Sequence, residues 1–387
     1  MNVDNVLYLI DSAGLDTPDK VDRATSEWPI KRLGELREQL WEILRAGSDA
    51  ALKKTDASDP FDFVASASMR GEDGCFAWGC RIGKARILSR YGALYARRVL
   101  IPVRIGVSPI YGETEHEARY GFAGTLMSIL EYRPLIENGI ASLSAGALCY
   151  CREHLNKAVP SHPKIESIAR SLIDHQSKKF SASIEHRSDG SDMLILSGPE
   201  DYLPHGKVFY RFSNKNRRAV RKVQSHAQSQ SNAGLTLARR KLVVEQLFQR
   251  IAYDVTIQQY FTTSNEAAYL TDLPGEAQVL NLLNASEENE VRNALFAKHL
   301  LHSVPLLDEV PIEIIIKLRK EEPDAFLQYR AAIAKVIREY GKGKTSLSEK
   351  DAKNISRDIL EPELARLRIQ ANTIRRAGIR KAAAKTV

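Results

Sequence analysis

The sequence predicts a predominantly α-helical α+β protein, in which two helical domains lie on either side of a small antiparallel β-meander. Two observations lead to this prediction. Apolar residues recur over most of the chain at the spacing of three and four that is typical of amphipathic helices. Three short runs rich in β-branched and aromatic residues gather near its middle. The predicted parts are a helical N-terminal domain with short strands at 1–178, the β-meander at 179–212, a helical C-terminal domain at 213–345, and a linker with a basic C-terminal helix at 346–387.

The first part of the chain combines helical patterns with short extended runs. Helical spacing occurs in Trp28–Leu52, Ile82–Ala96, Glu113–Leu130 and Ile165–Ser177. Pro102 interrupts a β-branched run at 99–105, which indicates an edge strand or an extended connector because proline has no N–H to donate to a sheet. The pair Arg133-Pro134 predicts the end or a kink of the helix before it. A short strand is expected within 140–150.

The predicted meander begins with a β-hairpin. Its strands are Phe180–His186 and Met193–Ser197, and the pair Asp189-Gly190 between them favours a tight turn. Lys207–Phe212 is expected to add a third strand.

Beyond the meander the pattern is helical. Predicted helices cover 214–229, 237–261, 276–284, 287–303, 311–321 and 323–340. One face of the helix at 237–261 is apolar and is expected to be buried. That face contains Val244, Leu247, Phe248, Ile251 and Val255.

Length and composition exclude several classes of protein. A chain of 387 residues suggests two or three domains, and 43% hydrophobic with 27% charged residues is typical of a globular protein. No segment approaches the ~20 apolar residues of a membrane span, and no basic region precedes the short apolar run at the N-terminus. We therefore expect a cytoplasmic protein. Four cysteines do not suggest a disulfide framework, and no P-loop occurs. No cofactor is expected.

The net charge of +8 conceals a strong segregation of charge. Three blocks, Gly74–Gly112, Tyr202–Val244 and Leu364–Val387, contain 24 Lys and Arg residues and no Asp or Glu. The rest of the chain therefore has a net charge of −16. Such segregation is expected of a protein with one surface that faces a polyanion, or of one that docks a basic surface onto an acidic partner.

The middle block contains the most compact cationic pattern. If residues 215–228 form a helix, Arg217, Arg218, Arg221 and Lys222 share an arc of roughly 140°. An ordinary solvated helix face has the same pattern. The predicted nucleic-acid-binding residues are Arg81, Lys84, Arg86, Arg90, Arg97, Arg98, Arg217, Arg218, Arg221, Lys222, Arg239, Arg240, Lys241, Arg375 and Arg376.

Aromatic residues stand among the cations of the first block. Phe76 and Trp78 precede Arg81, and Tyr91 and Tyr95 lie among further arginines. Single-stranded nucleic acids are bound by this mixture of base stacking and phosphate contact. Aromatic residues at helical spacing are more often core residues, which favours burial of the two tyrosines.

One pattern suggests catalysis. Arg292-Asn293 followed by His299 resembles the signature of HEPN-type ribonucleases, where arginine would bind the scissile phosphate and histidine would transfer protons near neutral pH. Arginine also precedes His175 and His226 at similar spacing, about as often as chance predicts. No catalytic residue is predicted, and a HEPN-like ribonuclease stays an alternative.

Cysteine and histidine offer zinc ligands in two places. The residues are Cys75, Cys80, Cys149, Cys151 and His154. Their spacings, Cys-x4-Cys and Cys-x-Cys-x2-His, are not those of common zinc-binding motifs, and free cysteines usually behave as small buried hydrophobes. No metal site is therefore predicted.

Three segments resemble uncharacterised bacterial proteins of phage-defence gene neighbourhoods. They are RYGALYARRVLIP at 90–102, EYRPLIENGI at 131–140 and PIEIIIKLRKEEPDAFLQYRAAI at 311–333. The resemblance implies a bacterial or phage-related intracellular setting and assigns no site residues. With the charge pattern, it leads us to expect a cytoplasmic nucleic-acid-binding subunit of an antiviral defence assembly, with a protein partner and with DNA or RNA undecided. A protein-interaction component that docks an acidic partner is the alternative.

Overall fold

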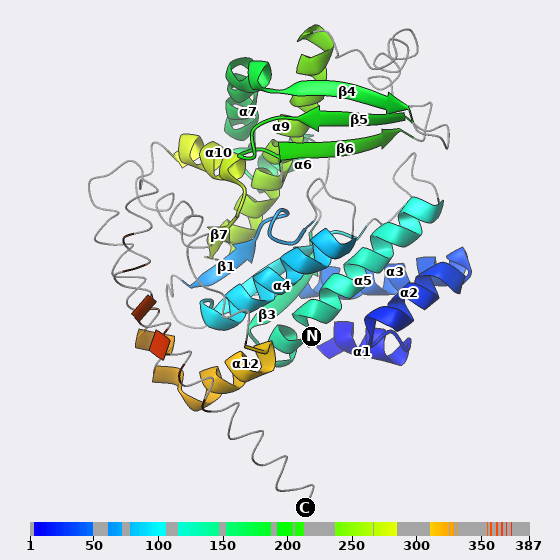
Figure 1. Cartoon of the computed structure of the whole chain (residues 1–387), viewed down its shortest axis with the longest axis vertical. Coiled ribbons are helices and arrows are strands. Elements are labelled where there is room, and N and C mark those ends of the chain that lie inside the picture. The colour runs from blue at the N-terminus through cyan, green and yellow to red at the C-terminus, as the bar shows by residue number, and fades with distance from the viewer. Residues whose placement is uncertain are drawn as a thin grey trace, which may run out of the picture.

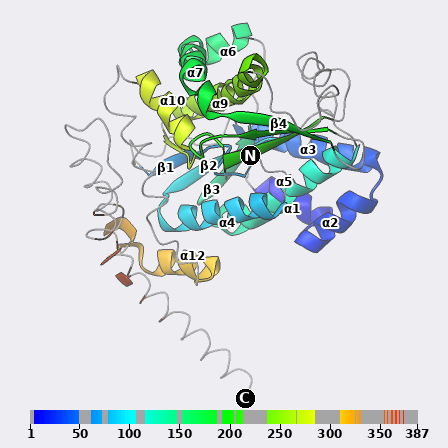
Figure 2. The same cartoon turned by 45° about the horizontal axis from the view of Figure 1, so that its top comes forward.

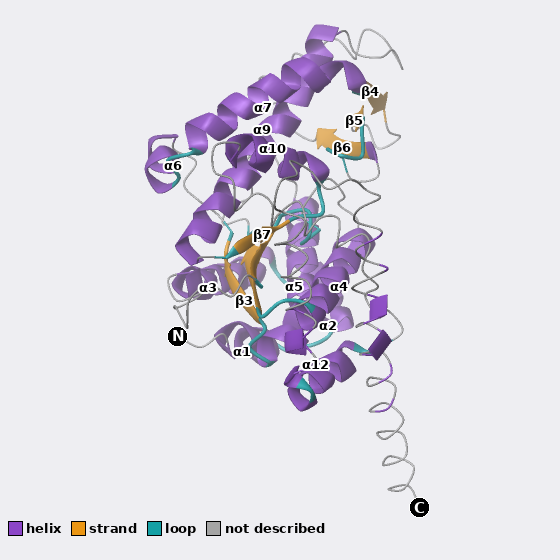
Figure 3. Cartoon of the chain, turned by 90° about the vertical axis from the view of Figure 1, so that its left-hand side faces the viewer, coloured by secondary structure: helices purple, strands orange, loops and turns teal. Residues whose placement is uncertain are grey.

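Figure 1 shows the computed structural model of the chain. The structure describes residues 4–48, 61–71, 78–105, 115–146, 152–186, 192–203, 206–212, 237–265, 267–284 and 310–324, with short stretches and single positions between 326 and 373. Helices make up most of this part, as the colours of Figure 3 show. The prediction of a mostly helical protein is confirmed.

The main sheet has four parallel strands. They are β1 (Asp62–Ala65), β2 (Arg98–Val103), β3 (Ala141–Ala145) and β7 (Ala268–Leu270). Their order across the sheet is β3-β2-β1-β7, and Phe63 of β1 is flanked by Val99 and Ala268. Strands β2 and β3 are added on one side of β1, whereas β7 is added on the other. The direction of strand addition therefore reverses between β1 and β7.

Helices cover both faces of this sheet, as Figure 2 shows. α4 (Trp78–Leu94) connects β1 to β2, α5 (Glu115–Glu137) connects β2 to β3, and both lie on one face. α9 (Leu237–Asn265) covers the other face, where its Ile257 and Phe261 pack against Val64 and Leu100. Successive side chains of a strand point to opposite faces, so alternate strand residues enter the core on the α4 and α5 side.

Further helices surround α4 and α5. α1 (Asp4–Ser12), α2 (Pro18–Glu27) and α3 (Ile30–Ser48) pack on α5, and α3 also lies against β3. α12 (Ile312–Glu321) packs on α4 and α5. Its Arg319 donates hydrogen bonds to the carbonyls of Ala96 and Arg97, at 2.6 and 3.0 Å, just past the end of α4. A cation is favourable there because the last carbonyls of a helix lack partners within the helix.

A second core lies beside an antiparallel sheet. The strands, in spatial order, are β4 (Ser181–His186), β5 (Asp192–Ser197) and β6 (Lys207–Phe212). The helical elements of this core are α7 (His162–Gln176), a 3-10 turn (Ser177–Lys179), the first part of α9, and α10 (Pro274–Asn284). α6 (Arg152–Ala158) packs against α7. The rings of Phe180 and Tyr202 pack on Phe248 of α9, with centroids 6.2 and 5.1 Å away. α9 therefore extends from this core to the parallel sheet.

The predicted layout of two helical domains around a meander is not confirmed, because the main sheet is parallel. That sheet takes β7 from beyond the meander, and α12 joins the same core. Strands do occur at 181–212 where the sequence predicted them, and they form the smaller sheet. The predicted division of the chain into four parts stays a prediction.

Pro102 lies inside the sheet, so the prediction of an edge strand or connector was wrong. β2 pairs with β1 on one side and with β3 on the other. The Val99 N–H donates to Ile140, and the Val103 carbonyl accepts from Gly146, so these alternate residues of β2 bond toward β3. The nitrogen of Pro102 therefore faces β1, beyond Leu100, the last β2 residue that pairs with β1. Its missing N–H removes no hydrogen bond from the ladder.

Other local predictions had mixed outcomes. α5 continues through Pro134 to Glu137 instead of ending before it. α9 continues beyond residue 261, where the predicted helix ended, to Asn265. The expected strand within 140–150 is β3, and the predicted apolar face of α9 is buried. The predicted helices at 214–229 and 287–303 lie outside the described residues. Within the described ranges, no helix is both long and apolar enough to cross a membrane.

Candidate functional site

Buried polar residues gather at the carboxyl edge of the parallel sheet, the edge at which its strands end. Open α/β sheets bind ligands beyond this edge, at the point where the direction of strand addition reverses. In this fold that point lies between β1 and β7. The buried or largely buried polar residues that follow these two strands are Ser66, Ser68, Arg70, Thr271, Asp272 and Glu276.

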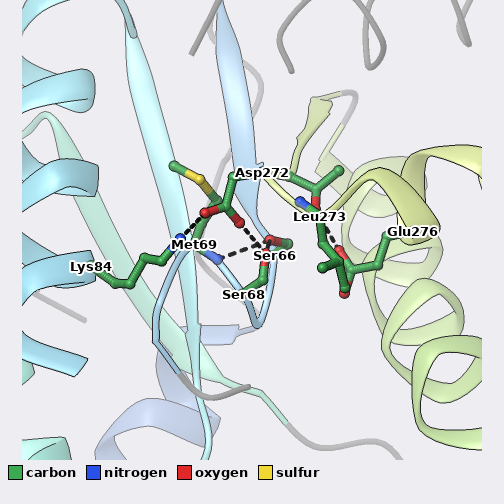
Figure 4. A network of polar contacts seen from close by, with 8 residues as sticks. Ser66, Ser68, Met69, Lys84, Asp272, Leu273 and Glu276 are labelled. Carbon is green, nitrogen blue, oxygen red and sulfur yellow. Dashed lines mark hydrogen bonds and ion pairs between the residues drawn. The ribbon is translucent and has the colours of Figure 1, made fainter. Parts of the chain in front are cut away.

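A tight turn after β1 holds two serine hydroxyls together. The main chain of Ser66 donates to the Leu270 carbonyl of β7, at 2.8 Å. Its Oγ accepts from the Met69 N–H at 3.1 Å and lies 3.2 Å from Oγ of Ser68 (Figure 4). Gly71 closes the turn with φ of +69°, and a Cβ there would lie 2.7 Å from the Arg81 Cα. Only glycine tolerates both conditions, so the turn is fixed closely against α4.

Asp272 links this turn to α4. One carboxylate oxygen accepts a hydrogen bond from Ser68 Oγ, and the other accepts from Lys84 Nζ (Figure 4). The side chains of Lys84 and Asp272 are 33% and 12% exposed. The Ser-Lys-Asp cluster, namely Ser66, Ser68, Lys84 and Asp272, therefore extends from the interior to solvent.

The loop that bears Asp272 is held by a buried carboxylate. Glu276, in the first turn of α10, accepts hydrogen bonds from the Thr271 hydroxyl at 2.6 Å and from the Tyr269 hydroxyl at 2.7 Å. The Thr271 hydroxyl oxygen also accepts from the Leu273 N–H at 3.1 Å. These bonds fix the backbone on both sides of Asp272, so its carboxylate is preorganised.

α9 brings polar groups to the same edge from the other face of the sheet. Gln258 Nε2 donates to the carbonyl of Ala65, the last residue of β1, at 3.2 Å. One turn earlier, the buried carboxylate of Asp254 pairs with Arg104, which directly follows β2. The carboxyl edge is thus polar along β2, β1 and β7.

The predicted basic residues of the first block all contact groups of the chain itself. Lys84 belongs to the cluster, and Arg97 and Arg98 both bind Asp62 at the opposite, amino edge of the sheet. Arg81 donates to Thr125 at 2.9 Å, Arg86 pairs with Glu131 at 2.9 Å, and Arg90 donates to the Val310 carbonyl at 2.8 Å. The structure therefore brings Arg97 and Arg98 together but places Lys84 at the other end of the sheet.

Burial and ion pairing act in opposite directions on Asp62. Burial raises the pKa of its carboxyl, but the hydrogen bonds and charges of Arg97 and Arg98 outweigh burial and hold the pKa below its usual value. Glu131 raises the pKa of the Arg86 guanidinium by a hydrogen bond and by its charge.

Many predicted functional residues lie outside the described ranges. They are Arg217, Arg218, Arg221, Lys222, Arg292, His299, Arg375 and Arg376. The backbones of Arg239, Arg240 and Lys241 form the first turn of α9. Tyr91 and Tyr95 are buried, which confirms them as core residues, and Trp78 stacks on Tyr120 with ring centroids 4.7 Å apart.

The possible zinc ligands are only partly described. Cys80 and His154 are exposed on α4 and α6, whereas Cys75, Cys149 and Cys151 lie outside the described residues. Among the residues that the structure places, no three His, Cys, Asp or Glu side chains gather as a metal site. The absence of a metal stays a prediction.

Sequence reasoning missed Ser66, Ser68, Asp272 and Glu276, and it selected Lys84 only for its charge. A scan against protein-family models finds no match, and searches of curated proteins and of solved structures find none either. The arrangement of these side chains is therefore the main guide to function.

Proposed function

We propose that the protein binds a small anion with hydroxyl groups, of the nucleotide class, at the Ser-Lys-Asp cluster. The observation that supports this proposal is the position of the cluster at the carboxyl ends of β1 and β7, where strand addition reverses. Doubly wound sheets commonly bind nucleotides at this point, and we extend that to this chain by analogy of fold.

The chemistry of the cluster suits such a ligand. The Lys84 ammonium is one-third exposed and attracts an anionic group. The Asp272 carboxylate accepts hydrogen bonds, as from a sugar hydroxyl, and the two serine hydroxyls both donate and accept. A largely buried ion pair contributes little net stability because desolvation offsets the attraction between the charges. Since the ion pair of Lys84 and Asp272 adds little to stability, we infer that its role is to bind a ligand.

Calorimetric titration with ATP, GTP, CTP and NAD tests the proposal. We expect saturable binding of at least one nucleotide by the parent protein. Lys84→Met and Asp272→Asn should each weaken that binding about tenfold or more, the factor that follows from ~1.5 kcal/mol for a hydrogen bond to a charged group. Lys157→Met is the matched control, because Lys157 forms an exposed ion pair with Glu153 on α6. Absence of binding to all four nucleotides, or equal loss in the control, rejects the proposal.

Nucleic-acid binding is a second candidate function, and the segregation of charge along the chain favours it. In this proposal the protein is a subunit of a bacterial antiviral defence assembly, a setting that rests on the sequence resemblance alone. Docking of an acidic protein partner and HEPN-like RNA cleavage by Arg292 and His299 are its alternatives.

A salt titration distinguishes these candidates. Replacing Arg217, Arg218, Arg221 and Lys222 with Gln should flatten the dependence of log K on log[salt] by roughly three to four units if each contacts a duplex phosphate. Affinity should fall similarly for all sequences, because phosphate contacts contain little base information. An unchanged slope rejects these four contacts. Loss of a co-purifying protein with nucleic-acid binding intact favours partner docking, and RNA cleavage abolished by His299→Ala favours the ribonuclease.

A further inference from the structure

Gln258 binds the last residue of β1, directly before the Ser-Lys-Asp cluster begins at Ser66. Lys84 of α4 binds Asp272, which follows β7, whereas Gln258 of α9 binds the end of β1. The neighbouring Ile257 anchors this part of α9 by packing against Val64 and Leu100. Gln258 thereby contacts Ala65, the residue directly before Ser66.

Within the described part of the chain, only one of the two polar atoms of the Gln258 side-chain amide forms a hydrogen bond. It is 1% exposed, and its Nε2 donates to the Ala65 carbonyl. Its Oε1 is buried and has no hydrogen-bond partner among the described residues. Exchanging the two amide atoms does not resolve this, because it would place an oxygen against the Ala65 carbonyl oxygen and leave a buried nitrogen.

A buried acceptor without a partner destabilises a fold. Buried unpaired groups are rare enough that each calls for a physical explanation. A ligand that supplies an N–H to Oε1 explains this one. In a nucleotide, the phosphates and the sugar are matched by Lys84, Asp272 and the serines, so the uncharged N–H donor belongs to the base.

We propose that Gln258 is a specificity-determining residue that accepts a hydrogen bond from the amino group of a nucleobase. This inference rests on the proposed nucleotide site and adds a choice among nucleotides. The protein should bind bases with an exocyclic amine more tightly than analogues without one, because Gln258 Oε1 stays without a hydrogen-bond donor when the analogue is bound.

Matched pairs of nucleotides test the inference on the unmodified protein. The pairs are ATP with purine riboside triphosphate, GTP with inosine triphosphate, and CTP with zebularine triphosphate, where the second member lacks the amino group. For the nucleotide that binds, we expect the amino form to bind about tenfold more tightly, the factor that one hydrogen bond typically provides. Equal affinities within the pair overturn the role of Gln258 but leave the nucleotide site intact. Absence of binding by all six compounds overturns the role of Gln258, and it rejects the nucleotide site as well if NAD also fails to bind.

Gln258→Leu provides the second test. The variant should bind both members of the pair equally. Because it also removes the hydrogen bond that Gln258 Nε2 donates to the Ala65 carbonyl, the readout is this loss of discrimination and not the melting temperature. Gln249→Leu is the control, since Gln249 is exposed on the same helix and its Nε2 donates to Glu245 at 3.4 Å. A discrimination that survives in Gln258→Leu shows that another group recognises the amine. If that variant does not fold, the parent comparison still decides the inference.

Discussion

The two edges of the parallel sheet each contain a carboxylate paired with cations, but the pairs differ in composition and exposure. At the amino edge, Asp62 binds both Arg97 and Arg98, and these three side chains are 5%, 27% and 24% exposed. At the carboxyl edge, Asp272 binds one lysine and one serine, and the side chains of Asp272 and Lys84 are 12% and 33% exposed. The amino edge is a structural clamp, because two guanidinium groups hold one carboxylate. The carboxyl edge leaves its carboxylate and its single cation more accessible, which a ligand site requires.

The largest expected effect is at the amino edge. Asp62→Asn leaves two half-buried guanidinium groups without their carboxylate, and we expect the free energy of unfolding to fall by about 3–5 kcal/mol. Denaturant titration of parent and variant measures this change. Asp16→Asn removes the carboxylate of an exposed ion pair with Lys20 and should cause no measurable change. A small effect for Asp62→Asn would show that the amino edge is no clamp.

The same carboxylate makes stability depend on pH. The pKa of Asp62 is lowered in the folded protein from its usual 3.8. A lowered pKa means that the stabilisation is fully present above the unfolded value and is lost as the pH falls through the folded value. The difference in stability between parent and Asp62→Asn should therefore narrow below pH 3.8. Thermal melts between pH 6 and pH 2 test this, and a constant difference would contradict it.

The sequence predicted the helices far better than the parallel sheet. α9 and α12 each bury one face, which leaves a helical period in the sequence. β1 and β7 are short and carry buried residues on both faces, so they show no alternation of polar and apolar residues. Parallel pairing also needs no local turn, so no local pattern in the sequence predicted that β1 and β7 pair with Phe63 opposite Ala268.

The sequence did not predict the candidate site, because the pairing of β1 with β7 has no local signal in the sequence. Ser68 and Asp272 are 204 residues apart, and each is an ordinary loop residue in its own segment. Lys84 stood out only as one cation of an acid-free block. Its partner, Asp272, follows β7, and the sequence did not predict that β7 lies beside β1. The count of charges therefore suggested a surface for a polyanion instead of a local ion pair.

A smaller effect on stability is expected at the carboxyl edge. Asp272→Asn keeps a polar group beside Ser68 and leaves a lysine that solvent partly reaches, so we expect a loss of about 1–2 kcal/mol. The freed amine of Lys84 should also react faster with an acylating reagent, as measured by peptide mass spectrometry. A loss as large as that for Asp62→Asn would mean that both edges are structural.

The smallest effect is expected on the solvent face of α4, where Arg86 pairs with Glu131 and its side chain is 65% exposed. Arg86→Gln should change the free energy of unfolding by less than ~1 kcal/mol, because water replaces most of what an exposed ion pair contributes. This makes Arg86 a clean probe of the nucleic-acid proposal, since a change in binding cannot follow from a loss of fold.

If the Arg86 guanidinium contacts a duplex phosphate, Arg86→Gln should reduce the slope of log K against log[salt] by about 0.9. Glu131→Gln should then act in the opposite direction, because it frees the same guanidinium for the phosphate. Identical slopes in the parent and both variants would remove Arg86 from the binding surface.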